Sequence, residues 1–301
     1  MTENSVTRAR WAIMVHGGAH EVPADQQDAA RDGCLAALQA GRSVLEAGGS
    51  AVDAVEAAVR VLEDRPVFNA GYGSAQNEDG EVETQASVMD GRTLDVGAVA
   101  ALKGVRNPVK VAARLLRDEA ILLVGDGANR FARECSAELC DPNDLIASDA
   151  AKRTCDTVGC VALDAQGHVA AAVSTGGLDG QRVGRVGDSP QPGCGFYAED
   201  KVGAVALTGE GERIARMMSA GRIMGRLAAE AGPAEAIEAT LSEMTARIGG
   251  EAGGIALTAD GQLGWWHNSP HMPVAFEAAG SEGPKVYLTK QEEGAHGTTP
   301  R

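Results

Sequence analysis

Apolar positions near the start of the chain indicate one strand followed by two helices. The apolar run at residues 11–15 predicts a strand, and the helical period after it predicts a helix over about 25–47. Ser50 then predicts the start of a second helix, because its hydroxyl can accept a hydrogen bond from the first turn while Asp53 reaches back.

Further along the first half, a hairpin and a third helix are expected before the pattern breaks. Residues 85–102 alternate as strands do and are interrupted by Asp90-Gly91, a strong hairpin signal. Asn107 followed by Pro108 predicts a helix start, with asparagine as the cap and proline at the first helical position. Residues 134–156 mix charges, proline and small polar side chains, which predicts an exposed, flexible linker.

Strand-like alternation resumes directly after that linker. Residues 157–177 form two alternating runs around a polar turn and predict an antiparallel hairpin. The remaining elements expected are a strand at 202–207, helical structure in 208–232, a helix at 233–248 and a second hairpin at 253–269. Strands and helices in blocks predict a layered fold with antiparallel sheets, not a repeated βαβ array.

Composition narrows the classes of partner. The 301 residues contain 27 Lys+Arg and 42 Asp+Glu, a formal net charge of −15, which disfavours nucleic acid and anionic membranes as partners. With 3% aromatic residues and 39 glycines, the interior is expected to consist of small aliphatic side chains at close backbone contacts. The chain shows neither a membrane-spanning run nor a secretory signal pattern, so a cytoplasmic location is predicted.

Common catalytic signatures are missing from the sequence. It contains no Walker motif, no G-x-G-x-x-G after a strand, no H-E-x-x-H and no G-x-S-x-G. His267 and His271 have helical spacing, but Pro270 and Pro273 break any helix that would place them on one face. No cofactor for catalysis is therefore expected.

Thr157 is the first candidate for chemistry, because it begins a strand directly after the linker and follows Asp156. Cleavage of the Asp156–Thr157 bond would give Thr157 a free α-amino group beside its own hydroxyl. An α-amine with a pKa of about 7.7 can act as a base at neutral pH and activate that hydroxyl. A threonine at a strand start is also ordinary β structure, so the residue alone leaves both interpretations open.

Seven segments, taken in order and spacing, favour the catalytic interpretation of Thr157. They are HGGA at 16–19, the helix after Ser50 leading into FNAGYGS at 68–74, ASVMDGRTLDVGAVAALKGVRNPV at 86–109, DTVGCVALDAQG at 156–167, STGG at 174–177, GRVGDSP at 184–190 and TGEGE at 208–212. Together they resemble the plant-type L-asparaginase and isoaspartyl peptidase family of N-terminal-nucleophile hydrolases. The resemblance implies an α+β fold, a four-layer αββα sandwich forming one domain over residues 1–301. It also implies autocatalytic cleavage into an α chain of residues 1–156 and a β chain of residues 157–301.

The resemblance assigns catalytic roles position by position. Thr157 corresponds to the nucleophile, and Thr175 to the threonine that tunes it. Thr208 and the backbone N–H of Gly209 correspond to the oxyanion hole, which stabilises charge on the scissile carbonyl. Asn69 corresponds to a residue that supports the nucleophile.

Substrate recognition is implied by two charged residues of the GRVGDSP segment. Arg185 corresponds to the guanidinium that holds the substrate α-carboxylate, where a two-pronged donor suits two oxygens. Asp188 corresponds to the partner of the α-ammonium. The implied activity is hydrolysis of the β-amide of L-asparagine and of β-aspartyl dipeptides, by a homodimer of cleaved αβ units.

A structural sodium ion is a further implication of the resemblance. The matching positions would bind it through backbone carbonyls, so their side chains do not test the site. These positions are Leu62, Glu63, Arg65, Phe68, Ala70 and Tyr72.

Three departures from the family pattern keep alternatives open. His20 stands where a glycine usually follows HGGA, and Gln85 stands where an aspartate is usual. Asp156 before the nucleophile matches glycosylasparaginases, which act on GlcNAc-asparagine, and the related threonine aspartase. The alternatives are therefore a glycosylasparaginase, or an uncleaved, inactive family member with a binding role.

Overall fold

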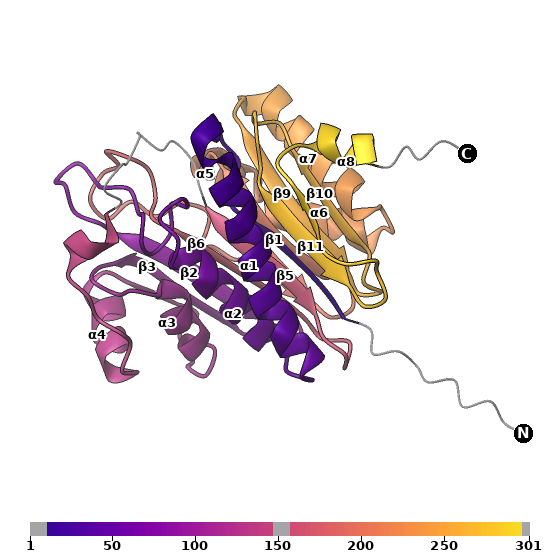
Figure 1. Ribbon diagram of the computed structural model, residues 1–301. Coiled ribbons are helices and arrows are strands. Elements are labelled where there is room, and N and C mark those ends of the chain that lie inside the picture. The colour runs from indigo at the N-terminus through magenta and orange to yellow at the C-terminus, as the bar shows by residue number, and fades with distance from the viewer. Residues whose placement is uncertain (1–10, 147–156, 297–301) are drawn as a thin grey trace, which may run out of the picture.

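Two β-sheets lie face to face between two layers of helices in the computed structural model, which describes residues 11–146 and 157–296 (Figure 1). The larger sheet has eight strands in the order β12-β11-β1-β5-β6-β2-β3-β4. Its strands are β1 (Ala12–His16), β2 (Thr84–Asp90), β3 (Val96–Leu102), β4 (Leu122–Val124), β5 (Val158–Leu163), β6 (Val169–Thr175), β11 (Val274–Ala278) and β12 (Lys285–Tyr287). The smaller sheet has the order β10-β9-β8-β7, from β7 (Phe196–Glu199), β8 (Gly203–Gly209), β9 (Ala252–Thr258) and β10 (Leu263–His267).

Helices cover the outer face of each sheet. The larger sheet packs against α1 (Gln27–Glu46), α2 (Ala51–Glu63), α3 (Pro108–Leu115) and α4 (Asp126–Glu134). The smaller sheet packs against α6 (Ser219–Ala228) and α7 (Pro233–Ile248), with α5 (Gly211–Met217) beside them. The remaining helical elements are η1 (Ala24–Gln26), η2 (Pro142–Leu145) and α8 (Lys290–His296). None of the helices in the described ranges is long and apolar enough to cross a membrane.

Alternating side chains build three apolar layers, as the period of two along a strand requires. In β1, Ile13 and Val15 join the helix-facing layer, whereas Ala12 and Met14 join the layer between the sheets. A third layer lies between the smaller sheet and its helices. The αββα sandwich expected from the sequence is confirmed.

Small residues allow these layers to approach closely. A Cβ on Gly97 would lie 2.0 Å from the carbonyl oxygen of Ala112, so α3 rests directly on β3 at a position where only glycine fits. The glycine-rich, aromatic-poor composition therefore allows a helix to pack directly against the backbone of a strand.

Local signals placed most elements correctly. The second helix begins as predicted, with the Ser50 hydroxyl accepting from Asp53 N and donating to the Asp53 carboxylate at 2.7 Å. The helix expected at 233–248 and the hairpin of β5 and β6 are also confirmed. The helical stretch 208–232, in contrast, is split into α5 and α6 by Met218, whose φ is +49°.

The described part of the expected linker is largely exposed, as predicted, but hydrogen bonds anchor it to the domain. Cys140 N donates to Gly104 O, and Leu145 is buried in η2 with its carbonyl accepting from Gly73 N at 2.7 Å. Residues 147–156, which include Asp156, lie outside the described residues.

Candidate active site

Three threonines meet on the inner faces of the two sheets at one end of the sandwich. Thr157 immediately precedes β5 and is four residues from Val161, so its side chain points to the same face as that of Val161, between the sheets. Thr175 ends β6 and lies on the same face as Val173, two residues before it. Thr208, near the end of β8, lies on the same face as Ala206. Val173 and Ala206 both belong to the layer between the sheets. Strand periodicity thus directs all three side chains into the same layer.

A small cavity at this end collects most of the residues assigned from the sequence. Its lining includes Thr157, Thr175, Arg185, Asp188 and Gly209, together with Gly177, Leu178 and Ser189. Thr208 is fully buried directly before Gly209, while Asn69 lies behind the cavity wall.

Thr157 is buried, with 6% of its surface exposed, and its hydroxyl oxygen lies 3.3 Å from the Ser189 hydroxyl. Ser189 is held in turn, because Ser87 donates to its carbonyl at 2.7 Å. Ser189 directly follows Asp188 in the GRVGDSP segment, and no sequence pattern predicts its contact with Thr157.

Thr175 and Asn69 order the loop that closes the cavity. The Thr175 hydroxyl oxygen accepts from Gly177 N at 3.0 Å, and the Asn69 amide donates to Gly177 O at 2.7 Å. The Asn69 side-chain oxygen accepts from Ala75 N at 2.8 Å, so both ends of this buried amide are used. Asn69 therefore reaches the cavity lining through Gly177, and its role in supporting Thr157 stays a prediction.

Arg185 presents its guanidinium to the cavity with 14% of its side chain exposed. Its Nε and Nη2 donate to the two carboxylate oxygens of Glu212 at 2.7 and 3.0 Å, and Nη1 donates to the Gln181 side-chain oxygen at 3.3 Å. Because the guanidinium has five N–H donors, one on each terminal nitrogen is still available. These two donors can hold a carboxylate end-on.

Asp188 is an almost fully buried carboxyl group whose Oδ2 has no hydrogen-bond partner among the described residues. Burial raises the pKa of Asp188 to about 7, although the nearby Arg185 acts in the opposite direction. A Cβ on Gly211 would lie 2.6 Å from Asp188 Oδ1, so glycine is required beside it. An unpaired buried acceptor of this kind is completed by a cation such as an ammonium group.

Thr208 and Gly209, the residues expected to form the oxyanion hole, lie at the edge of the cavity, and Gly209 lines it. The Thr208 hydroxyl oxygen accepts from Ala19 N, of the HGGA segment, at 3.1 Å, which leaves its hydrogen free to donate. Gly209 has φ +133°, and a Cβ there would lie 2.5 Å from Glu251 O. The segments HGGA and TGEGE thus meet at this one point.

Gln85 holds the loop that carries Arg185. Its side-chain oxygen accepts from Gly187 N at 2.9 Å, and its nitrogen donates to Arg185 O at 3.2 Å. An ionised carboxylate could make only the first of these bonds. Glutamine at position 85, where the family usually has aspartate, therefore allows both hydrogen bonds to the loop that carries Arg185.

The loop after α2 can be tested for the expected cation site. The carbonyl oxygen of Glu63 accepts from Tyr72 N at 2.7 Å, and a Cβ on Gly73 would lie 2.5 Å from the carbonyl oxygen of Phe68. The loop thus folds closely over its own carbonyls, each of which keeps a second lone pair. No cluster of three or more His, Cys, Asp or Glu in the described ranges could hold a metal. Main-chain oxygens fit the sodium prediction, which stays a prediction.

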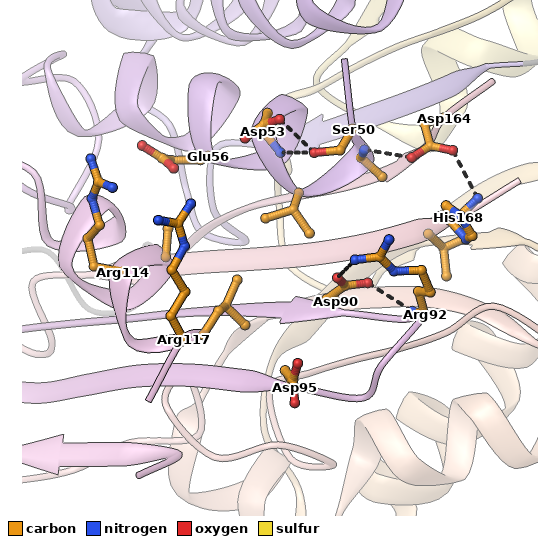
Figure 2. A pocket seen from close by; sticks show the side chains of 15 residues that line it. Ser50, Asp53, Glu56, Asp90, Arg92, Asp95, Arg114, Arg117, Asp164 and His168 are labelled. Atoms are coloured by element: carbon orange, nitrogen blue, oxygen red, sulfur yellow. Dashed lines mark hydrogen bonds and ion pairs between the residues drawn. The ribbon is translucent and has the colours of Figure 1, made fainter. Parts of the chain in front are cut away.

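A hollow of about 540 Å³ lies at the opposite end of β5 and β6 from Thr157 (Figure 2). It is lined by charged side chains, but its buried acid, Asp164, is used by main-chain groups: Oδ2 accepts from Ala51 N and Oδ1 from His168 N, each at 3.0 Å. Asp164 therefore ties the start of α2 to the β5–β6 turn. None of the predicted site residues lines this hollow, so we assign it no catalytic role.

The sandwich, with a threonine at the start of an inner strand, defines an N-terminal-nucleophile hydrolase fold. The family model described as asparaginase matches residues 9–154 and 144–286. The chain belongs to the asparaginase family.

Relatives match over most of the chain. An isoaspartyl peptidase/L-asparaginase of Xenopus laevis is 40% identical over 266 residues, covering 83% of this chain and 86% of that protein. The protein of the same name from Bos taurus is 40% identical over 87% of this chain and 92% of its own length. A plant-type L-asparaginase of Thermococcus kodakarensis is 38% identical over 91% of this chain and 99% of its own length.

Proposed function

We propose that the protein hydrolyses the β-amide of L-asparagine and β-aspartyl dipeptides with Thr157 as an N-terminal nucleophile. The convergence of Thr157, the Thr208–Gly209 pair and the Arg185–Asp188 pair around one cavity carries this proposal. The names of the family and of its relatives support it.

The proposed reaction begins with self-cleavage between Asp156 and Thr157. The α-amine of Thr157 then accepts the proton of its own hydroxyl, and the oxygen attacks the substrate β-carbonyl. Negative charge on the carbonyl oxygen is stabilised by the Thr208 hydroxyl and Gly209 N–H. The leaving nitrogen takes a proton and departs as ammonia or as an amino acid. Water then hydrolyses the aspartyl ester with the same amine as base.

Recognition of the aspartyl unit follows from the two charged residues. Arg185 would hold its α-carboxylate and Asp188 its α-ammonium, which delivers the carbonyl one methylene away to Thr157. An α-aspartyl peptide lacks the free α-carboxylate, so the two end-on donors of Arg185 lose their partner, and a lost charge-assisted contact costs about 1.5 to 3 kcal/mol. Glutamine displaces its amide carbon by one bond, and such a misplacement can cost about 100-fold in rate.

Two experiments test the proposal. Denaturing gels and N-terminal sequencing should show a chain beginning at Thr157 in the wild type and not in Thr157→Ala. Initial rates should be high on asparagine and β-Asp-Leu and very low on α-Asp-Leu and glutamine. Arg185→Ala should lose most activity on both good substrates while still cleaving itself. Turnover of α-Asp-Leu at a comparable rate would overturn the recognition scheme.

The assembly and surroundings proposed for the enzyme rest on the same resemblance. We propose a homodimer of cleaved αβ units in the cytoplasm, without a catalytic cofactor and with a sodium ion in the loop from Leu62 to Tyr72. Light scattering of the cleaved protein tests the dimer. Thermal unfolding with sodium or with choline as the only monovalent cation tests the ion, since a bound ion raises stability.

A further inference from the structure

A second hollow, of about 500 Å³, opens beside the catalytic cavity. Leu178 lines both, Glu210 directly follows Gly209, and Ala19, on its wall, donates to the Thr208 hydroxyl. The hollow thus begins at the oxyanion residues. We call it the vestibule; its lining is Ala19, His20, Glu21, Leu178, Glu210, Glu212, Glu251 and Pro270.

The position of the vestibule determines which part of a substrate meets it. Another hollow shares Leu178 and Glu212 with the vestibule, but Arg185 lines this hollow and not the vestibule, so it marks the end where the α-carboxylate would bind. The leaving group lies at the other end of the aspartyl unit, beyond the scissile carbonyl that faces Thr208 and Gly209. The amino acid released from a β-aspartyl dipeptide therefore faces the vestibule.

Unpaired negative charge lines this vestibule. Of its four glutamates, Glu210 is paired with Arg213 and Glu212 with Arg185. Glu21 and Glu251 are exposed, and neither carboxylate has a hydrogen bond or ion pair among the described residues. No lysine or arginine of the described chain lines the vestibule, so two negative charges remain uncompensated.

We infer that the vestibule selects basic leaving groups, so that β-aspartyl dipeptides ending in lysine or arginine are turned over more efficiently than those ending in aspartate or glutamate. This inference rests on the proposed function and narrows its substrate class. The α-carboxylate of the leaving amino acid is common to all these dipeptides and cancels in the comparison. His20, which departs from the family pattern, lies on the same wall and belongs to this leaving-group surface.

The test compares kcat/KM for β-Asp-Lys, β-Asp-Leu and β-Asp-Glu at low salt, with asparagine as the reference substrate. Exposed charge pairs are individually weak, so attraction of lysine and repulsion of glutamate should together give a ratio of about tenfold in favour of β-Asp-Lys. At 1 M NaCl, where the screening length is about 3 Å, the ratio should fall towards one. Glu21→Gln combined with Glu251→Gln should lower the low-salt ratio in the same way. Glu282→Gln, which removes an exposed carboxylate that does not line the vestibule, should leave it unchanged.

The outcomes separate this inference from the proposed function. Equal kcat/KM values for β-Asp-Lys and β-Asp-Glu, alongside good turnover of asparagine, would overturn the inference and leave the proposed function standing. A ratio that the double variant does not change would do the same. Absence of turnover on asparagine and on all three dipeptides would overturn both.

Discussion

Arg185 and Glu212 form a two-pronged ion pair at the entrance to the catalytic cavity, with Nε to Oε1 at 2.7 Å and Nη2 to Oε2 at 3.0 Å. The arginine lowers the pKa of Glu212 by donating to it, so the pair persists in mildly acidic solution. Because Glu212 takes one edge of the guanidinium, the end-on edge is the one that would bind the substrate carboxylate under the proposed function. Glu212 is therefore a positioning residue for Arg185.

Glu212→Ala should raise KM for asparagine by about tenfold, since one charge-assisted contact that orients Arg185 is worth about 1.5 kcal/mol or more. The kcat value should change little, because Glu212 does not touch the reacting atoms. Glu212→Gln, which keeps one acceptor, should give a smaller rise. Steady-state kinetics on both variants, with gels to verify self-cleavage, check this. An unchanged KM, or a loss confined to kcat, contradicts the positioning role.

Asp188 should add an acid limb to the pH profile of kcat/KM. Burial raises its pKa to about 7, and only its ionised form can pair with the substrate ammonium. The α-amine of Thr157, with a pKa of about 7.7, must also be neutral to act as a base. Below pH 7 the slope of log kcat/KM should therefore approach two. The slope of log kcat should stay near one, because a bound ammonium keeps Asp188 ionised.

Succinamate provides the matched control for Asp188, because it keeps the carboxylate and the amide of asparagine and lacks the ammonium group. Its hydrolysis does not need an ionised Asp188, so its kcat/KM should fall with a slope of only about one. Profiles between pH 5.5 and 8.5 are sufficient. Identical slopes for asparagine and succinamate would mean that Asp188 does not bind the ammonium.

Motifs and local patterns placed the central parts of the site and fold from the sequence. The inner position of Thr157 follows from strand alternation, and the capping of α2 by Ser50 follows from one hydroxyl. The pairs Thr157–Ser189 and Arg185–Glu212 could not be predicted in this way. Each joins segments whose approach depends on how the layers stack, which no local pattern contains.

Edge strands were missed for a related reason. β4 and β12 have three residues each, too few to show a period of two, and their neighbours in the sheet define them. Asn107 illustrates a local signal that tertiary structure overrides. Its side chain donates to Asp64 at 3.3 Å instead of capping α3, and Val109 N donates to Glu63 at 2.9 Å.

Gln85→Glu should weaken the loop that carries Arg185. A glutamate can still accept from Gly187 N, but its second oxygen would face the Arg185 carbonyl, and both are acceptors in a buried position. An unsatisfied buried group costs about 1 to 3 kcal/mol, so the Tm should fall by several degrees and KM for asparagine should rise. Gln39→Glu adds the same charge at an exposed position of α1 and should change neither value. Equal effects of the two variants would contradict the role of Gln85.

Glu63 should make the stability of the protein depend on pH. Its side chain is fully buried at the end of α2, where Oε1 accepts from Ser174 at 2.7 Å and from Val109 N at 2.9 Å, while Oε2 has no partner among the described residues. Burial raises its pKa from 4.5 to about 8. Between these two values the folded state holds a proton that the unfolded state has lost, so the free energy of unfolding falls as pH rises through this interval.

Glu63→Gln keeps the shape and the neutral charge of the protonated side chain. It should match the wild type near pH 4 and exceed its free energy of unfolding by about 2 kcal/mol at pH 6 and by about 4 to 5 kcal/mol at pH 9, because the unfolded wild type loses its proton above pH 4.5 while the folded wild type keeps it up to about pH 8. Denaturant unfolding of both proteins across this range isolates the contribution, since every other titrating group cancels in the difference. Glu282→Gln serves as the exposed control and should show no such divergence. Parallel stability curves for Glu63→Gln and the wild type would mean that Glu63 is ionised in the fold. Ser174 and Val109 N would then donate to a buried carboxylate instead of to a protonated side chain.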